Sequence, residues 1–164
     1  MPPNPPIVLL LACGNTLRSD DGIGPWLAAW AAQALHTNPA IRVIARQQWT
    51  PELAEDIAAA SAVLFLDCSV RAAPGQLDLI PVEPATAQPG LATHHLGAPQ
   101  LLALAQQLYN ACPAQAVLLT VGAGSTELGE AFSGPVQAAL PRACTLLEET
   151  VLRLLAASEP SHRA

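Results

Sequence analysis

Five short and mostly apolar runs are spread along the chain, each closed by a polar residue or a glycine. They lie at residues 7–13, 41–45, 62–66, 77–82 and 116–121. Apolar runs of this kind are typical of strands that are buried on both faces of a sheet. The pattern therefore predicts five strands. Pro81 indicates that the fourth lies at an edge, because proline cannot donate a hydrogen bond to a neighbouring strand.

Between these runs, apolar residues recur at helical spacing. This pattern predicts helices over residues 22–35, 51–60, 99–109 and 134–157. Thr50 followed by Pro51 is typical of a helix start, with an N-cap and then proline at the first helical position. Because strands alternate with helices, the sequence predicts a single α/β domain with a mostly parallel sheet. It spans residues 1–164, with 1–6 and 158–164 expected to be flexible tails.

Composition narrows the class of protein. Of 164 residues, 51% are hydrophobic and 12% are charged, which excludes a disordered chain. No apolar run reaches the ~18 residues that a membrane-spanning helix needs, so we expect no membrane insertion. The formal net charge of -6 disfavours a nucleic-acid partner, which would select a basic surface. With no secretory signal and four scattered cysteines, we expect reduced thiols and a cytoplasmic location.

Several familiar catalytic signatures are absent. The chain has no P-loop and no zinc-protease H-E-x-x-H helix, and no G-x-G-x-x-G follows the first strand. A glycine-rich turn precedes Ser125, but the G-x-S-x-G pattern of a nucleophilic serine is not met. We therefore interpret Ser125 as a loop hydroxyl.

Three polar residues follow the predicted strands where ligands bind in open α/β sheets. Asp21 comes after the first strand, Asp67 ends the third, and His94 lies in the loop before the third helix. If the first and third strands are neighbours, their carboxyl ends meet at one edge of the sheet. Two oxygen donors and one nitrogen donor, with positions left open, would then form a catalytic metal site.

Each of these residues also has a plainer interpretation. Asp21 could cap the first helix, and Asp20 is the better candidate for a plain cap or a solvated acid. Asp67 could form a turn after its strand. His94 and His95 are adjacent and would point to opposite sides of an extended segment, so only one of them would join the site.

Four segments, in order, resemble the hydrogenase maturation proteases, which trim the large subunit of NiFe hydrogenases. The family begins with a strand, Gly-Asn, a short loop, an Asp-Asp or Asp-Glu pair and Gly-x-Gly, and residues 14–25 read GNTLRSDDGIGP. VLFLDCSV around Asp67 is similar to the segment with the family's second acid, and THHLG at 93–97 to its histidine loop. Residues 121–136 are similar to the C-terminal part, so the resemblance covers residues 7–155.

The resemblance implies a three-layer α/β/α, phosphorylase/hydrolase-like fold with a five-stranded mixed sheet whose fourth strand is antiparallel. It also implies one cut near the C-terminus of a large-subunit precursor, after nickel has been loaded. The family's metal-binding acids fall on Asp21 and Asp67, and its histidine falls on His94, with His95 as the register alternative. These residues would contact nickel supplied by the substrate, and no permanent cofactor is implied. The partner would be the precursor, and we expect the protease to act as a monomer.

The chain departs from the family pattern at three places. Ala12 replaces a common glycine, and Asp21 stands where many members have the longer glutamate. The turn at residues 47–50 reads QQWT rather than Asp-Gly-Gly, which leaves the choice of substrate open. Two alternatives are a non-catalytic metal-binding assembly chaperone for hydrogenase, which would use the same residues, and a nucleoside hydrolase or phosphorylase-like enzyme. The latter needs a phosphate or ribose site, which a chain with seven Lys and Arg residues and no glycine cradle does not favour.

Overall fold

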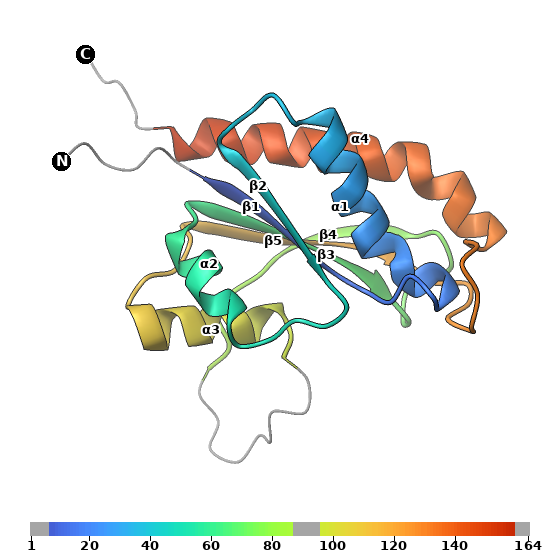
Figure 1. Cartoon of the computed structure of the whole chain (residues 1–164), viewed down its shortest axis with the longest axis horizontal. Coiled ribbons are helices and arrows are strands. Elements are labelled where there is room, and N and C mark those ends of the chain that lie inside the picture. Colours follow the sequence, from blue (N-terminus) through green and yellow to red (C-terminus); the bar gives the residue numbers. More distant parts are fainter. Residues whose placement is uncertain (1–6, 87–95, 160–164) are drawn as a thin grey trace.

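A computed structural model of the chain describes residues 7–86 and 96–159 (Figure 1). The elements in chain order are β1 Val8–Cys13, the 3-10 turn η1 Ser19–Gly22, α1 Ile23–Ala34, β2 Ile41–Arg46, α2 Leu53–Ala59, β3 Ala62–Ser69, β4 Leu77–Pro81, α3 Ala98–Tyr109, β5 Gln115–Gly122 and α4 Gly134–Ser158. All the predicted strands and helices are therefore present. None of the helices within the described ranges is long and apolar enough to cross a membrane.

The five strands form one mixed sheet in the order β2-β1-β3-β5-β4. β1 pairs in parallel with β2 and β3, β3 pairs in parallel with β5, and β4 alone runs antiparallel to its neighbour. Figure 1 shows α1 and α4 on one side of the sheet and α2 and α3 on the other. The α/β/α layers, the antiparallel fourth strand and its edge position are thus confirmed.

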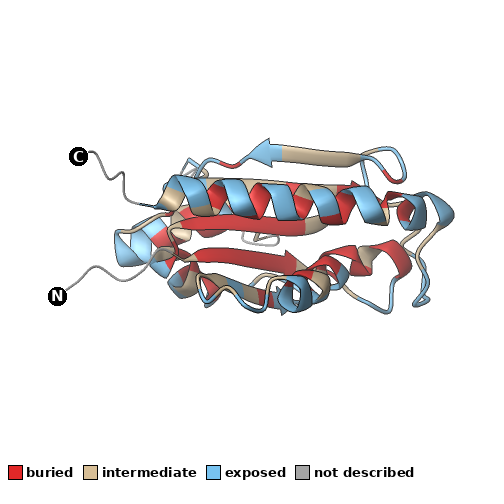
Figure 2. Ribbon diagram, turned by 90° about the horizontal axis from the view of Figure 1, so that it is seen from above, coloured by how far each residue is buried: buried red, intermediate tan, exposed pale blue. Residues whose placement is uncertain are grey.

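The side chains of β1 and β3 alternate between two cores, because successive residues of a strand point to opposite faces. Leu10 and Leu64 pack in the core under α1 and α4, whereas Leu11 and Phe65 pack in the core under α2 and α3. Figure 2 shows the central strands buried between helices whose outer surfaces are exposed. Burying each such leucine stabilises the fold by about 1.5–3 kcal/mol, which is why these strands appear as unbroken apolar runs.

Two predicted boundaries differ from the structure by more than one residue, and the others differ by one residue or agree. β3 continues past the apolar run to Ser69, because residues 67–69 stay paired with residues 120–122 of β5. α2 begins at Leu53 rather than at Pro51, since the amide of Leu53 bonds the carbonyl of Thr50 in a preceding turn. α4 includes Ser158, the first residue of the predicted C-terminal tail.

Candidate functional site

The loop that joins β1 to α1 packs closely over the carboxyl ends of β1 and β3. Gly24 permits this approach, since a Cβ there would overlap the carbonyl oxygen of Cys13 and lie 2.9 Å from that of Leu66. Gly14 has a φ of +152°, and a Cβ at this position would overlap the carbonyl oxygen of Asp21. Gly14 thus lets the loop fold back on itself at Asp21, while Gly24 brings the start of α1 against the strand ends. Asp21, between them in η1, lies at the rim of the sheet.

Asp21 lies half-buried in η1 and does not cap α1. Its Oδ2 accepts a hydrogen bond of 2.7 Å from the amide of Asn15, at the start of the same loop. The N-cap position of α1 is occupied by Gly22, and no side chain caps the helix. The helix-cap interpretation of Asp21 is therefore wrong, and its carboxylate instead closes the loop beside the strand ends.

Asp67 lies within β3 rather than in a turn. Its neighbours in the alternating pattern, Val63 and Phe65, pack in the core under α2 and α3, so its side chain points to that same face. One oxygen accepts a 2.7 Å hydrogen bond from the amide of Cys68. Burial raises the pKa of the Asp67 carboxyl against the hydrogen bonds from Cys68 and Cys13, and the nearby Asp21 carboxylate adds to the rise. Asp21, in the η1 turn, and Asp67, in β3, thus lie near the same edge of the sheet, where η1 contacts β3.

The structure contradicts the prediction that Asp20 is a plain cap or a solvated acid. Asp20 is 0% exposed, and it is bonded to the loop of residues 123–133. Its Oδ1 accepts from the amide of Ser133 (2.8 Å), and its Oδ2 accepts from the amides of Gly124 (2.7 Å) and Ser125 (3.0 Å) and the Ser133 hydroxyl (2.7 Å). Burial acts to raise the pKa of Asp20, but these hydrogen bonds outweigh it and hold the pKa below its usual value. The Ser125 hydroxyl accepts from the amide of Glu127, in keeping with its predicted loop role.

His94 and its alternative His95 lie outside the described residues. The following helix, α3, begins at Ala98 and packs Leu101 and Leu102 on the face to which Asp67 points. Within residues 7–86 and 96–159, no group of three or more His, Cys, Asp and Glu side chains is placed to hold a metal ion. Asp21 and Asp67 therefore need a further ligand, from the chain or from a partner, to complete a metal site.

Two cysteines beside the acids were not predicted as part of the site. Cys13 directly follows Ala12, which pairs with Leu66, so Cys13 lies next to Asp67 across the β1–β3 ladder. Burial raises the pKa of both thiols, and the carboxylates of Asp21 and Asp67 add to the rise for Cys68, whose pKa reaches about 12. Both cysteines are therefore protonated at neutral pH and are poor nucleophiles. Only their positions in the sequence could have indicated this: Cys13 ends the first apolar run, and Cys68 directly follows Asp67.

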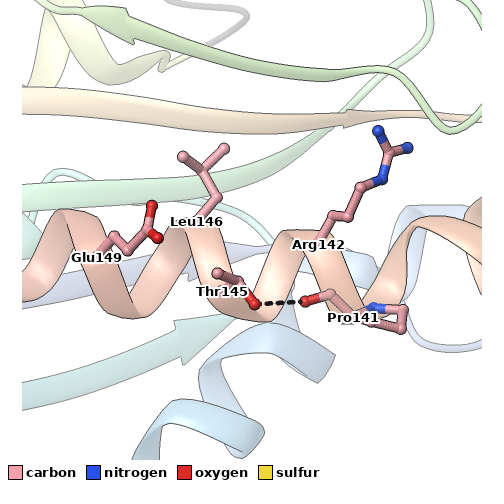
Figure 3. A pocket seen from close by; sticks show the side chains of 5 residues that line it. All are labelled: Pro141, Arg142, Thr145, Leu146 and Glu149. Carbon is pink, nitrogen blue, oxygen red and sulfur yellow. Dashed lines mark hydrogen bonds between the residues drawn. The ribbon is translucent and has the colours of Figure 1, made fainter.

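Two hollows on the described part of the molecule lie away from these acids. One, of about 260 Å³, is formed by side chains of α4 alone, between Pro141 and Glu149 (Figure 3). The other, of about 500 Å³, is lined in part by residues 112–117, which lead into and begin β5, and by the end of β4 at Pro81, which pairs with Val117. This is the end of β5 opposite to the one that lies beside Asp67, so neither hollow belongs to the candidate site.

The two acids offer two kinds of chemistry. A carboxyl whose pKa is raised, as burial raises that of Asp67, can take up and release a proton during hydrolysis. Two adjacent carboxylates also repel each other, and an arriving cation relieves that repulsion. The arrangement can therefore support proton transfer, cation binding, or both.

No protein-family model matches the chain, and a search of curated proteins finds no match. Solved structures do match. The hydrogenase maturating endopeptidase HybD from E. coli superposes with a TM-score of 0.72 at 23% identity, covering 90% of this chain and 93% of that one. The NiFe hydrogenase maturation protease HycI from Thermococcus kodakarensis KOD1 gives 0.63 at 24%, covering 94% and 95%. The hydrogenase 2 maturation peptidase from Thaumarchaeota archaeon SCGC_AB-539-E09 gives 0.62 at 25%, covering 88% and 97%. The resemblance found in the sequence is thus confirmed in three dimensions: this chain has the fold of the hydrogenase maturation endopeptidases.

Proposed function

We propose that the chain is an endopeptidase that removes a C-terminal peptide from the nickel-loaded precursor of a NiFe-hydrogenase large subunit. One observation carries the proposal. Asp21, in the η1 turn that contacts β3, and Asp67, near the carboxyl end of β3, lie at the same edge of the sheet, in a fold shared with proteins that are named hydrogenase maturation endopeptidases. In this proposal Asp21, Asp67 and His94 contact the nickel, and the protease acts as a cytoplasmic monomer.

The charges around the two acids favour a cation delivered by the substrate. Within the described residues, the one salt bridge joins Arg42 to Asp56, and no arginine pairs with Asp21 or Asp67. Nickel tolerates mixed nitrogen and oxygen ligands, and two carboxylates with open positions hold it weakly unless the precursor supplies ligands of its own. Stable engagement then requires a precursor that already carries nickel, which makes cleavage conditional on metal insertion.

His94 is the third ligand in this proposal. It precedes Ala98, the first residue of α3, by four positions, and α3 packs on the face of the sheet to which Asp67 points. The helix that follows His94 therefore lies on the side of the sheet to which Asp67 points. His95 is the alternative, and separate alanine variants distinguish the two.

Asp67 contributes its carboxylate to the nickel in this proposal, as Asp21 does. Burial raises the pKa of the Asp67 carboxyl, and an arriving cation opposes that rise because it stabilises the charged form.

The deciding experiment measures the mass of a nickel-loaded large-subunit precursor before and after incubation with the protein. We expect loss of a C-terminal peptide, abolished by Asp67→Asn and His94→Ala and absent with nickel-free precursor. Glu148→Gln, which changes an exposed acid on α4, is the matched control and should cleave normally. Binding of the precursor with no change in mass would refute the peptidase and indicate the non-catalytic assembly chaperone instead.

A further inference from the structure

We propose that Asp20 is a positioning residue for Asp21, and that it acts by fastening the η1 turn to the loop of residues 123–133. The role in catalysis rests on the function proposed above, whereas the role in placing Asp21 does not. The paired acids of the sequence therefore divide into one that faces the site and one that holds it in place.

The contacts of Asp20 are those of a carboxylate for which the surrounding backbone is arranged. Four donors converge on a side chain that solvent does not reach, and three of them are backbone amides. One of these amides belongs to Ser133, which is also the N-cap residue of α4. Asp20 therefore joins η1 to the start of that helix. A buried anion satisfied in this way has one preferred position, and it fixes the backbone that carries it.

The backbone of the turn is held in an uncommon conformation by the same loop. Ser19 has a φ of +51°, in the left-handed region that residues other than glycine rarely adopt. Its amide donates to the carbonyl of Gly129 (2.7 Å), and the amide of Asp20 donates to the carbonyl of Ser125 (3.0 Å). Such a conformation persists when surrounding contacts determine it, and here those contacts come from residues 125–133.

Asp21 depends on this turn because it shares a peptide unit with Asp20. Both side chains start from the η1 turn. The carboxylate of Asp20 accepts hydrogen bonds from the loop of residues 123–133, whereas that of Asp21 accepts one from the amide of Asn15. A rotation that releases one side chain therefore moves the other. A displacement of about 1 Å in a catalytic group is enough to reduce the rate about 100-fold, so loosening the turn would separate Asp21 from its place beside Asp67.

The test combines a structural measurement with a kinetic one. In Asp20→Asn we expect amide exchange at Asn15, measured by NMR, to be at least tenfold faster than in the unmodified protein. Exchange at Leu10 and Leu64 in the sheet should stay within threefold of its original rate. With nickel-loaded precursor, we expect kcat to fall about 100-fold, and KM to rise as well because Asp21 contacts the nickel of the substrate in the proposed function. Ser133→Ala, which removes only the hydroxyl donor, should show both effects to a smaller degree and serves if Asp20→Asn does not fold.

A variant that is merely less stable provides the control. Val151→Ala alters a buried residue of α4 far along the chain from Ser133 and should leave both Asn15 exchange and kcat near their original values. Unchanged Asn15 exchange in Asp20→Asn and in Ser133→Ala would overturn the positioning role. If the unmodified protein cleaves no precursor, the proposed function fails, but the exchange measurement still decides whether Asp20 positions Asp21.

Discussion

Replacing Asp20 by asparagine exchanges one carboxylate oxygen for an NH2 group at a buried acid that accepts four hydrogen bonds. The amide keeps the shape of the carboxyl group but carries one oxygen instead of two. If its nitrogen takes the place of Oδ1, it faces the amide of Ser133, and one partly buried donor loses its acceptor. If it takes the place of Oδ2, it faces the amides of Gly124 and Ser125, and both of these donors lose theirs. The first orientation is the less costly one.

The donor that loses its acceptor should lower the free energy of unfolding by about 1–3 kcal/mol, and the three remaining bonds weaken further because their acceptor is no longer charged. In a domain of this size, each 1 kcal/mol lowers the melting temperature by about 2–4 °C. The lost bond alone should therefore lower the melting temperature at pH 7 by about 2–12 °C.

Thermal unfolding followed by circular dichroism at several pH values tests this reasoning. The folded-state pKa of Asp20 is lowered, so its stabilising contribution is complete above the ordinary aspartate value of about 3.9 and is lost as the pH falls through the folded-state value. The difference between the two proteins should be constant near neutral pH and should shrink in acid. A melting temperature within 1 °C of the original at pH 7, or a difference that grows in acid, would refute the account.

Two further substitutions test the charge of Asp67 and the close packing at Gly24. Asp67→Asn should raise the melting temperature at pH 7, because burial raises the pKa of Asp67 and so disfavours its charged form in the folded state. The gain should vanish in acid, where both side chains are neutral, and a lower melting temperature at pH 7 would contradict it. Gly24→Ala should destabilise the protein by about 1–3 kcal/mol in a denaturant titration, because the new Cβ overlaps the carbonyl oxygen of Cys13. An unchanged or higher denaturation midpoint would show that α1 can move away from the strand ends at little cost.

Hydropathy alone was sufficient to locate the elements of the fold. The strands are buried on both faces, so their apolar runs stand out, and Pro81 marked the edge strand correctly. The end of β3 was missed because pairing with β5 continues over residues 67–69 after the apolar run has stopped. Backbone hydrogen bonds hold residues 67–69 in the sheet, and the hydropathy of a sequence does not reveal such bonds.

The division of labour between Asp20 and Asp21 could not be predicted from their positions. The two acids are identical and adjacent, and both precede a helix, so local rules assign either of them to the cap. Their difference comes from partners 104 to 113 residues away for Asp20 and six residues away for Asp21. The family resemblance selected Asp21 without that information, whereas the burial of Asp20 depends on contacts that exist only in the folded chain.

The pairing between η1 and the loop of residues 123–133 also sets the order in which the protein can be completed during synthesis. β1 and η1 emerge from the ribosome early, but the donors that fix Asp20 belong to residues as late as Ser133. Domains fold as their segments become available, and contacts between distant residues form last. A nascent chain that ends before Gly124 therefore lacks all four donors to Asp20, and one that ends before Ser133 lacks two of the four. The candidate site takes its final shape only once the start of α4 has been made.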